Sequence, residues 1–176
     1  KSAIDEGKYF AYPPVGGYQD FREAIANKLN EENSIPCSAT NIVVSNGAKQ
    51  SIANVMYALV DPGDEVIVFS PYWVRYTALI ELAEGTPVFI EGSIVNDFKA
   101  TAEQLRNAIT SKTKAIIFSS PCNPTGSVFS KSELEAIAEV VKAHEDIFVI
   151  ADEIYEHINY TDDKVSLASL PGMFER

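Results

Sequence analysis

The sequence is poor in cysteine and has no long apolar run. Its two cysteines, Cys37 and Cys122, can form at most one disulfide, and their spacing suggests no metal site. We expect two reduced thiols, as is usual for a cytoplasmic protein. The apolar stretches at 115–118 and 147–151 are far shorter than the roughly 20 residues that cross a bilayer. The sequence therefore predicts a protein without a membrane-spanning helix.

Basic side chains are also scarce. The chain has 14 Lys and Arg residues against 25 Asp and Glu residues, which gives a formal charge of −11. Because an acidic surface repels phosphate backbones and anionic lipid headgroups, we expect neither nucleic acid nor a membrane as a partner. The first residue is Lys1 rather than Met, and no signal-peptide pattern follows it. Either the chain is processed or it begins inside a longer protein.

Helical and strand patterns alternate along the 176 residues. Phe21, Ile25 and Leu29 recur at four-residue spacing, which indicates an amphipathic helix. Ser130 followed by Glu133 is typical of a capping box at the start of another helix. The pattern predicts helices over 18–32, 48–60, 71–85, 101–109 and 130–144, and strands over 42–45, 65–69, 87–90, 115–119 and 147–151.

Short apolar strands that alternate with helices predict an α/β fold. The expected architecture is a three-layer sandwich, with helices on both faces of a mostly parallel sheet. Ligands of such sheets bind at the carboxyl ends of the strands, here residues 46–49, 70–73, 119–126 and 152–155. The stretch 161–176 is polar and interrupted by Pro and Gly, so we expect loop and turn without a core there.

Two candidate binding segments follow the first predicted strands. Gly47, Ala48 and Lys49 lead into a helix, where small residues and the helix N-terminus favour an anion, although an ordinary tight turn explains them equally well. Their spacing does not match a nucleotide-binding P-loop. Trp73, the one tryptophan, stands where an indole can stack on a flat ring, but a buried aromatic is the commoner role.

Asn123 lies between two prolines after a predicted buried strand. Pro121 and Pro124 restrict the backbone, and either preceding bond is able to be cis, which would hold Asn123 rigidly at the sheet edge. The Asn amide offers both a donor and an acceptor to a ligand. A simple connecting turn is the competing interpretation.

Asp152 comes directly after the last predicted strand, where a charge is costly without a partner. Tyr155 follows three residues later and offers a phenol to the same ligand. One hypothesis is a carboxylate bound to a ring nitrogen. The other is a metal site built from Asp152, Glu153, Glu156 and His157. Nothing else in the sequence indicates a hydrolase, and a solvated turn of helix accounts for the last three residues.

Several motifs that occur in a fixed order along almost the whole chain carry a family resemblance: Tyr12, Gly17-Tyr18, Arg22-Glu23-Ala24, Gly47-Ala48-Lys49-Gln50, Pro71-Tyr72-Trp73, Asn123-Pro124-Thr125-Gly126 and Asp152-Glu153-Ile154-Tyr155. In this order and spacing they resemble the fold-type I aminotransferases, which use pyridoxal 5′-phosphate. They look most like the prokaryotic aspartate aminotransferases of class I.

The resemblance implies contacts at the phosphate end of the cofactor. Gly47, Ala48 and Lys49 would hold the phosphate, and Lys49 would also reach the distal carboxylate of a substrate. Tyr12 would reach the phosphate bound to a neighbouring subunit, which implies a homodimer.

The resemblance also implies contacts with the cofactor ring. Trp73 would stack on the pyridine ring and contact the substrate. Asn123 would bind the ring hydroxyl and the substrate's α-carboxylate. Asp152 would pair with the pyridinium nitrogen, and Tyr155 would bind the ring hydroxyl.

By the same resemblance, residues 1–176 form part of the large cofactor-binding domain. The family places its Schiff-base lysine, a substrate-clamping arginine and most of the small domain beyond the Asp-Glu-Ile-Tyr motif, and the chain reaches Arg176 without them. We therefore expect no catalytic residue in this chain, and we expect the fragment alone to be inactive.

The function implied for the longer protein is transfer of an amino group from an amino acid, preferably aspartate, to a 2-oxo acid such as 2-oxoglutarate. Other chemistry on the same scaffold, such as C–S β-elimination or decarboxylation, is an alternative. A transcriptional regulator that carries this domain beside a DNA-binding module is another, and the residues before Lys1 would reveal it. A metal-dependent hydrolase is a further alternative, which elemental analysis would separate from the cofactor hypothesis.

Overall fold

Parallel strands and the helices that cover them make up the longer of two units in the chain. The computed structural model describes residues 1–161 and 164–176. The chain divides into the units Lys1–Ser51 and Ile52–Arg176.

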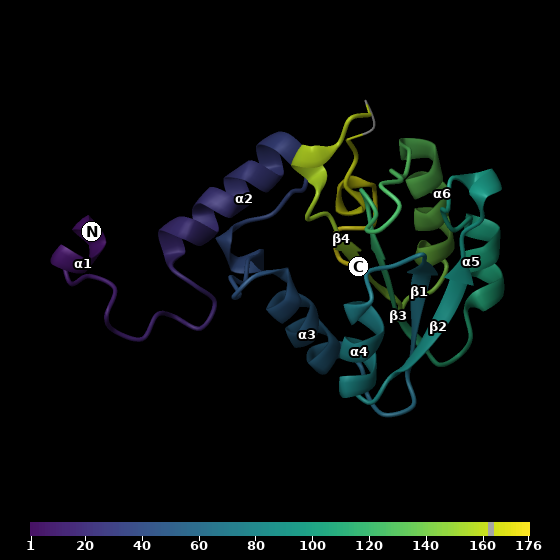
Figure 1. Cartoon of the computed structure of the whole chain (residues 1–176), viewed down its shortest axis with the longest axis horizontal. Helices are drawn as coiled ribbons and strands as arrows, with labels where there is room; N and C mark the ends of the chain where they lie inside the picture. Colours follow the sequence, from purple (N-terminus) through teal and green to yellow (C-terminus); the bar gives the residue numbers. More distant parts are fainter. Residues whose placement is uncertain (162–163) are drawn as a thin grey trace. The chain divides into compact units, whose positions relative to one another are not determined.

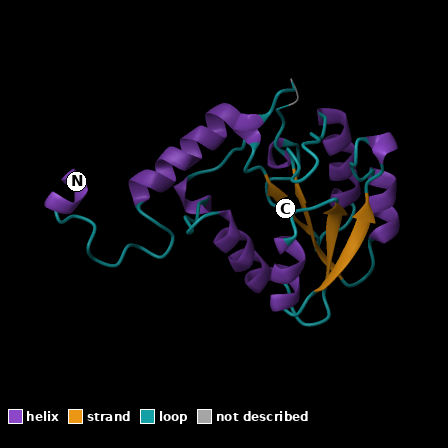
Figure 2. Ribbon diagram, in the orientation of Figure 1, coloured by secondary structure: helices purple, strands orange, loops and turns teal. Residues whose placement is uncertain are grey.

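The longer unit is built on a four-stranded sheet with the order β2-β1-β3-β4. All neighbouring strands are parallel (Figure 2). Their apolar runs fit this position, because a parallel sheet is covered on both faces. The predicted parallel sheet and four of its predicted strands are confirmed. The strands are β1 (Glu65–Ser70), β2 (Thr86–Glu91), β3 (Thr113–Ser119) and β4 (Phe148–Asp152).

Helices pack on opposite faces of this sheet (Figure 1). One face of β1 and β3 packs against α4 (Arg75–Leu82) and the part of α3 (Ala48–Leu59) that begins at Ile52. The other face packs against α5 (Ala102–Ala108) and α6 (Lys131–Lys142). Each fully buried aliphatic side chain in these two clusters contributes about 1.5–3 kcal/mol to stability. The three-layer α/β architecture is therefore confirmed.

Side chains cap the two helices on the α5 and α6 face. Ser130 Oγ accepts a hydrogen bond from the Glu133 amide at 3.3 Å, and Glu133 accepts one from the Ser130 amide at 2.8 Å. The predicted capping box is therefore confirmed. Thr101 and Gln104 form the same reciprocal arrangement at the start of α5.

The predicted strand over 42–45 is wrong. These residues are not in the sheet, and the Val44 amide donates to Gly16 O at 3.0 Å. Side chains of the Ile-Val-Val type favour strands, but a strand also needs a neighbour that pairs along its length. Here Gly17, with φ of +96°, approaches Val44 so closely that an added Cβ would lie 2.7 Å from the Val44 side chain.

Two further predictions need correction. The helix predicted from Pro71 begins only at Arg75, because residues 71–74 first continue past the end of β1 and Tyr72 stacks on Phe89 of β2 at 5.4 Å. The tail predicted to lack a core contributes to one. Leu167, in η4 (Leu167–Ser169), and Met173 are buried in the α5 and α6 cluster, while residues 162 and 163 lie outside the described part.

The shorter unit contains α1 (Ser2–Asp5), α2 (Gln19–Asn33) and the 3-10 turn η1 (Ala39–Asn41). The helix predicted over 18–32 corresponds to α2, although Phe21 is 52% exposed and only Ala26 of this helix is buried. Arg22 Nε donates to Ile42 O at 2.9 Å and ties α2 to the segment after η1. Within the described residues, each helix is too short or too polar to cross a bilayer.

Candidate functional site

The order of the strands places a crevice at one edge of the sheet. From β1 the chain passes through α4 to β2 on one side, and from β3 it passes through α6 to β4 on the other. Because α4 and α6 lie on opposite faces, the chain leaves the carboxyl ends of β1 and β3 in opposite directions. Such a switch in direction is where open parallel sheets bind ligands. Residues 71–73 follow β1 at this point, and residues 120–123 follow β3.

Asp152 is the last residue of β4 and pairs in register with Ser119 of β3. Its carboxylate is half-buried. Oδ2 accepts a hydrogen bond from the Tyr76 hydroxyl at 2.7 Å, and Oδ1 accepts one from the Ile154 amide at 3.3 Å. Within residues 1–161 and 164–176, no lysine, arginine or histidine forms an ion pair with it. A negative charge is thus fixed at the sheet edge by neutral donors alone.

Tyr76, on α4, is fully buried beneath this edge. Burial raises the pKa of its phenol, and the hydrogen bond to Asp152 and the charge of that carboxylate raise the pKa further. The hydroxyl therefore stays protonated and acts as a permanent donor to Asp152. It holds one carboxylate oxygen in place and leaves other lone pairs for a ligand.

Asn123 and Tyr155 form a second polar pair near Asp152. Asn123 Nδ2 donates to the Tyr155 hydroxyl at 3.2 Å, and the Asn123 amide donates to Ser119 Oγ at 3.3 Å. Since the Tyr155 oxygen accepts from Asn123, its own proton is available to an acceptor such as a ligand oxygen. The bonds preceding Pro121 and Pro124 are both cis.

Trp73 lies at the end of β1 beside the same group. Its indole meets the Tyr76 ring edge-on, with centroids 5.6 Å apart and an angle of 84° between the planes. The indole is half-buried. The structure therefore brings together Trp73, Asn123, Asp152 and Tyr155, which the sequence predicted to share one edge.

The other predicted contacts belong to the shorter unit. Gly47, with φ of +80°, precedes α3, whose first turn contains Ala48 and Lys49. An added Cβ on Gly47 would meet no atom within 4 Å, so the turn is open around it. Tyr12 is fully exposed. Their proposed contacts with a phosphate stay predictions.

The acidic residues after β4 do not form a common cluster. Glu153 Oε1 accepts a hydrogen bond from Ser166 Oγ at 2.8 Å, whereas Glu156 Oε1 lies 3.6 Å from His157 Nε2. Within the described residues, no three His, Cys, Asp or Glu side chains are arranged to hold a metal ion. Among the described residues after Asp152, the structure thus shows no donor set of the kind that the hydrolase hypothesis requires.

Asp152 lines neither of two surface cavities. One, of about 530 Å³, is lined among others by Val95, Lys99 and Glu133. The other, of about 360 Å³, is lined by aromatic and charged residues of the shorter unit: Lys8, Tyr9, Tyr18, Asp20 and Phe21. Neither cavity is lined by a predicted site residue.

Sequence reasoning missed Tyr76, and it included Ser119 in a ligand-binding stretch without foreseeing its contact with the Asn123 amide. Tyr76 and Ile80 share one face of α4, and such spacing is typical of a core position. Ser119 ends an apolar strand and looks like the start of a turn. The position of Tyr76 three residues after Trp73 was the one available signal, and in the structure a single turn, closed by the Tyr76 amide donating to Trp73 O at 3.0 Å, joins the two residues.

Comparison with known proteins places this geometry in a family. The sequence profile of the family "Aminotransferase class I and II" matches residues 1–172. A bifunctional aspartate aminotransferase and glutamate/aspartate-prephenate aminotransferase of Petunia hybrida is 47% identical over 99% of this chain and 36% of its own length. An aspartate aminotransferase of Bacillus subtilis is 43% identical over 96% of this chain and 42% of its own length.

A solved structure shows the same fold. The aspartate aminotransferase of Thermus thermophilus with maleate superposes with a TM-score of 0.92 at 40% identity, covering 96% of this chain and 44% of that one. The chain thus spans less than half the length of each of these three proteins. With a family profile that matches nearly all of its residues, the chain belongs to the class I and II aminotransferases.

Proposed function

We propose that this chain is the cofactor-binding part of a longer pyridoxal 5′-phosphate enzyme. The enzyme would transfer the amino group of aspartate to a 2-oxo acid such as 2-oxoglutarate. The observation that carries the proposal is Asp152, a half-buried carboxylate at the switch point of a parallel sheet, held by neutral donors and without a cationic partner in the described residues.

The residues around Asp152 fit this cofactor. A pyridinium N–H is a flat cation with one donor, and it would supply the missing positive charge beside Asp152. The Asn123 and Tyr155 pair, joined at 3.2 Å, offers donors to a ring oxygen. The half-buried Trp73 indole offers an aromatic face to a ring.

When bound, pyridoxal 5′-phosphate supplies an electron sink for negative charge at the substrate's Cα. The residues of this chain bind and orient. Asp152 keeps the ring nitrogen protonated, and Tyr76 fixes the direction of the carboxylate. Asn123 and Tyr155 hold the ring hydroxyl, and Asn123 also binds the substrate's α-carboxylate.

The proposal also assigns Gly47, Ala48 and Lys49 to the phosphate of the cofactor. The open turn at Gly47 and the start of the 12-residue helix α3 support this assignment, because helix N-termini favour anions. The cationic Lys49 favours a substrate with a second carboxylate, which supports aspartate. Maleate, with which the Thermus thermophilus aspartate aminotransferase was solved, is likewise a dicarboxylate.

The proposal includes a homodimer in the cytoplasm. In the proposed homodimer, the Tyr12 hydroxyl binds the phosphate held by a neighbouring subunit. Tyr12 is fully exposed, so its side chain is accessible to such a contact. Both cysteines are free thiols, and free thiols persist in reducing compartments. The covalent chemistry is assigned to a lysine outside these 176 residues, so the chain alone is expected to be inactive.

The test is the full-length protein with Asp152→Asn. Wild type should bind pyridoxal 5′-phosphate, with the visible absorbance of a bound cofactor, and should transaminate aspartate with 2-oxoglutarate. We expect Asp152→Asn to lower kcat by about 10²–10³-fold, because it removes the charge opposite the ring nitrogen.

Asp146→Asn is the matched control, since Asp146 is exposed at the amino end of the same strand. It should stay within about twofold of wild type. Equal cofactor binding and equal turnover in Asp152→Asn and wild type would refute the proposal.

A further inference from the structure

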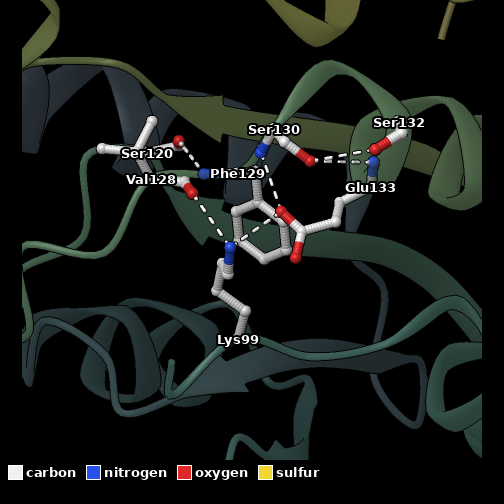
Figure 3. A network of polar contacts seen from close by, with 7 residues as sticks. All are labelled: Lys99, Ser120, Val128, Phe129, Ser130, Ser132 and Glu133. Atoms are coloured by element: carbon white, nitrogen blue, oxygen red, sulfur yellow. Dashed lines mark hydrogen bonds and ion pairs between the residues drawn. The ribbon is translucent and has the colours of Figure 1, made fainter. Parts of the chain in front are cut away.

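Lys99, a partly buried lysine, joins three segments of the longer unit. Lys99 Nζ donates to Glu133 Oε2 at 2.8 Å and to Val128 O at 3.2 Å, as Figure 3 shows. The side chain of Lys99 is only 15% exposed, and its ammonium group lies 6.0 Å from the centre of the Phe129 ring. The lysine therefore connects the segment before α5 with the segment that enters α6.

The same carboxylate oxygen of Glu133 serves two donors. Oε2 accepts from Lys99 Nζ and from the Ser130 amide, both at 2.8 Å. Burial alone would raise the pKa of Glu133, but hydrogen bonds from Lys99 and Ser130 and the Lys99 charge outweigh burial and lower the pKa. The N-terminus of α6 and Lys99 are thus fixed to each other through one charged group.

The backbone that leads to Lys99 is strained. Asp97 and Phe98 both have left-handed φ values, 54° and 56°, although neither is glycine. The turn also packs tightly on Gly92, where an added Cβ would lie 2.2 Å from Phe98 O. Strain of this kind costs free energy and persists where surrounding contacts fix the conformation. The contacts of Lys99 are such contacts.

Residues 120–129, which we call the Asn123 loop, end where Lys99 binds. The loop is closed across its ends by the Phe129 amide, which donates to Ser120 Oγ at 3.1 Å (Figure 3). Phe129 is buried, tilted against the Phe69 ring and edge-on to the Phe118 ring, and Val128 O accepts the Lys99 hydrogen bond. Inside the loop the Cys122 amide donates to Ser127 O at 2.9 Å. Displacing Val128 and Phe129 therefore moves one end of the loop that carries Asn123.

From this geometry we propose that Lys99 is a positioning residue for Asn123. It fixes the returning arm of the Asn123 loop against α6 and so sets where the Asn123 amide meets its ligand. This inference rests on the proposed function for the role of Asn123, and on the structure alone for the anchoring of the loop.

The test compares Lys99→Met, which keeps the aliphatic stem, with Lys99→Arg, which keeps the charge, in the full-length protein. Lys131→Met is the control, because the Lys131–Glu135 pair on α6 is exposed and 3.8 Å long. Two properties are measured. One is the amide hydrogen exchange of residues 120–129, and the other is ligand binding and turnover, given by the Kd of maleate and the KM and kcat for aspartate.

We expect Lys99→Met to speed exchange in the Asn123 loop and to raise the Kd of maleate and the KM about tenfold, with a smaller effect on kcat. Lys99→Arg should keep loop exchange and ligand binding close to those of wild type, and Lys131→Met should change neither property. If Lys99→Met does not fold, Glu133→Gln, which keeps an acceptor for Ser130, should shift both properties in the same direction.

Lower thermal stability with unchanged loop exchange and unchanged Kd would overturn the inference, because Lys99 would then only stabilise the fold. A failure of the proposed function looks different. Wild type itself would then bind neither pyridoxal 5′-phosphate nor maleate, and the exchange data would still decide whether Lys99 anchors the loop.

Discussion

Replacing Tyr76 with Phe removes one oxygen from the centre of the site. The Phe ring keeps the packing of a side chain that is 0% exposed, including the edge contact with Trp73. What is lost is the 2.7 Å hydrogen bond to Asp152 Oδ2. The substitution therefore isolates the contribution of that bond.

The expected loss is about 2 kcal/mol of stability. A hydrogen bond to a charged group contributes about 1.5–3 kcal/mol, and among the described residues the half-buried Asp152 keeps only the Ile154 amide as its other donor. For a chain of this size, about 2 kcal/mol lowers the melting temperature by about 4–8 °C. Tyr57→Phe, at a position that is 61% exposed on α3, should shift it by less than about 2 °C.

Because the pKa of Tyr76 is raised, the difference in stability between wild type and Tyr76→Phe depends on pH. In the unfolded chain its phenol ionises near the ordinary value of about 10, while in the folded chain it stays protonated to higher pH. The stability that the neutral phenol contributes is thus fully present below about pH 10 and declines above it, by about 1.4 kcal/mol at pH 11. The gap between wild type and Tyr76→Phe should therefore narrow above pH 10.

The assay is thermal unfolding of both proteins from pH 7 to 11, followed by the fluorescence of Trp73, which is the one tryptophan. An ultraviolet titration of the folded wild type and of Tyr76→Phe should show that the Tyr76 phenol does not ionise near pH 10. Equal melting temperatures for the two proteins, together with ionisation of the Tyr76 phenol near pH 10, would refute the role given to Tyr76.

Two further substitutions test other parts of the longer unit. Leu167→Ala, at a side chain that is 2% exposed, should destabilise the chain by about 2–4 kcal/mol in urea unfolding; a loss below about 0.5 kcal/mol would mean that the tail has no core role. Because contacts with Lys99 and Ser130 lower the pKa of Glu133, the stability that they contribute is present above about pH 4.5 and is lost as the pH falls through the lowered value. The melting temperature of Glu133→Gln should therefore fall less between pH 5 and pH 3 than that of wild type. An equal fall in the two proteins would contradict the assignment.

The sheet was predictable because its signal is local. β1 and β3 are continuous apolar runs, and only a strand covered on both faces needs such a run. The capping box of Ser130 and Glu133 is likewise encoded within four residues. Wherever neighbours in sequence determine the structure, the prediction and the structure agree.

The errors arose where distant residues decide. Residues 42–45 have the composition of a strand but no partner along their length in the described chain. The side chains of Val165, Leu167, Leu170 and Met173 pack into or against the core at spacings of two or three residues, which fit neither a helix nor a strand period. The sequence pattern therefore predicts a polar tail, whereas in the structure these side chains are buried in the core or packed against it.

The same distinction explains the site. Asp152 and Asn123 were found from their position after apolar strands and from motif order, both readable from the chain. Tyr76 was missed because its partner is 76 residues away, and a buried tyrosine on a helix face looks like any core residue until the acceptor is known. Lys99 was missed for the same reason, since Val128 and Glu133 lie 29 and 34 residues further along the chain.

The donors around Asp152 also limit what kind of ligand fits there. Its two oxygens already accept from Tyr76 at 2.7 Å and from Ile154 at 3.3 Å, and a carboxylate has about four acceptor sites, so about two remain. A hard cation such as Mg²⁺ or Ca²⁺ needs several oxygen ligands, and the described residues gather no such set. A ring N–H⁺ needs only one acceptor and a flat surface beside it. In the proposed function, Asp152 would supply that acceptor and Trp73 that flat surface.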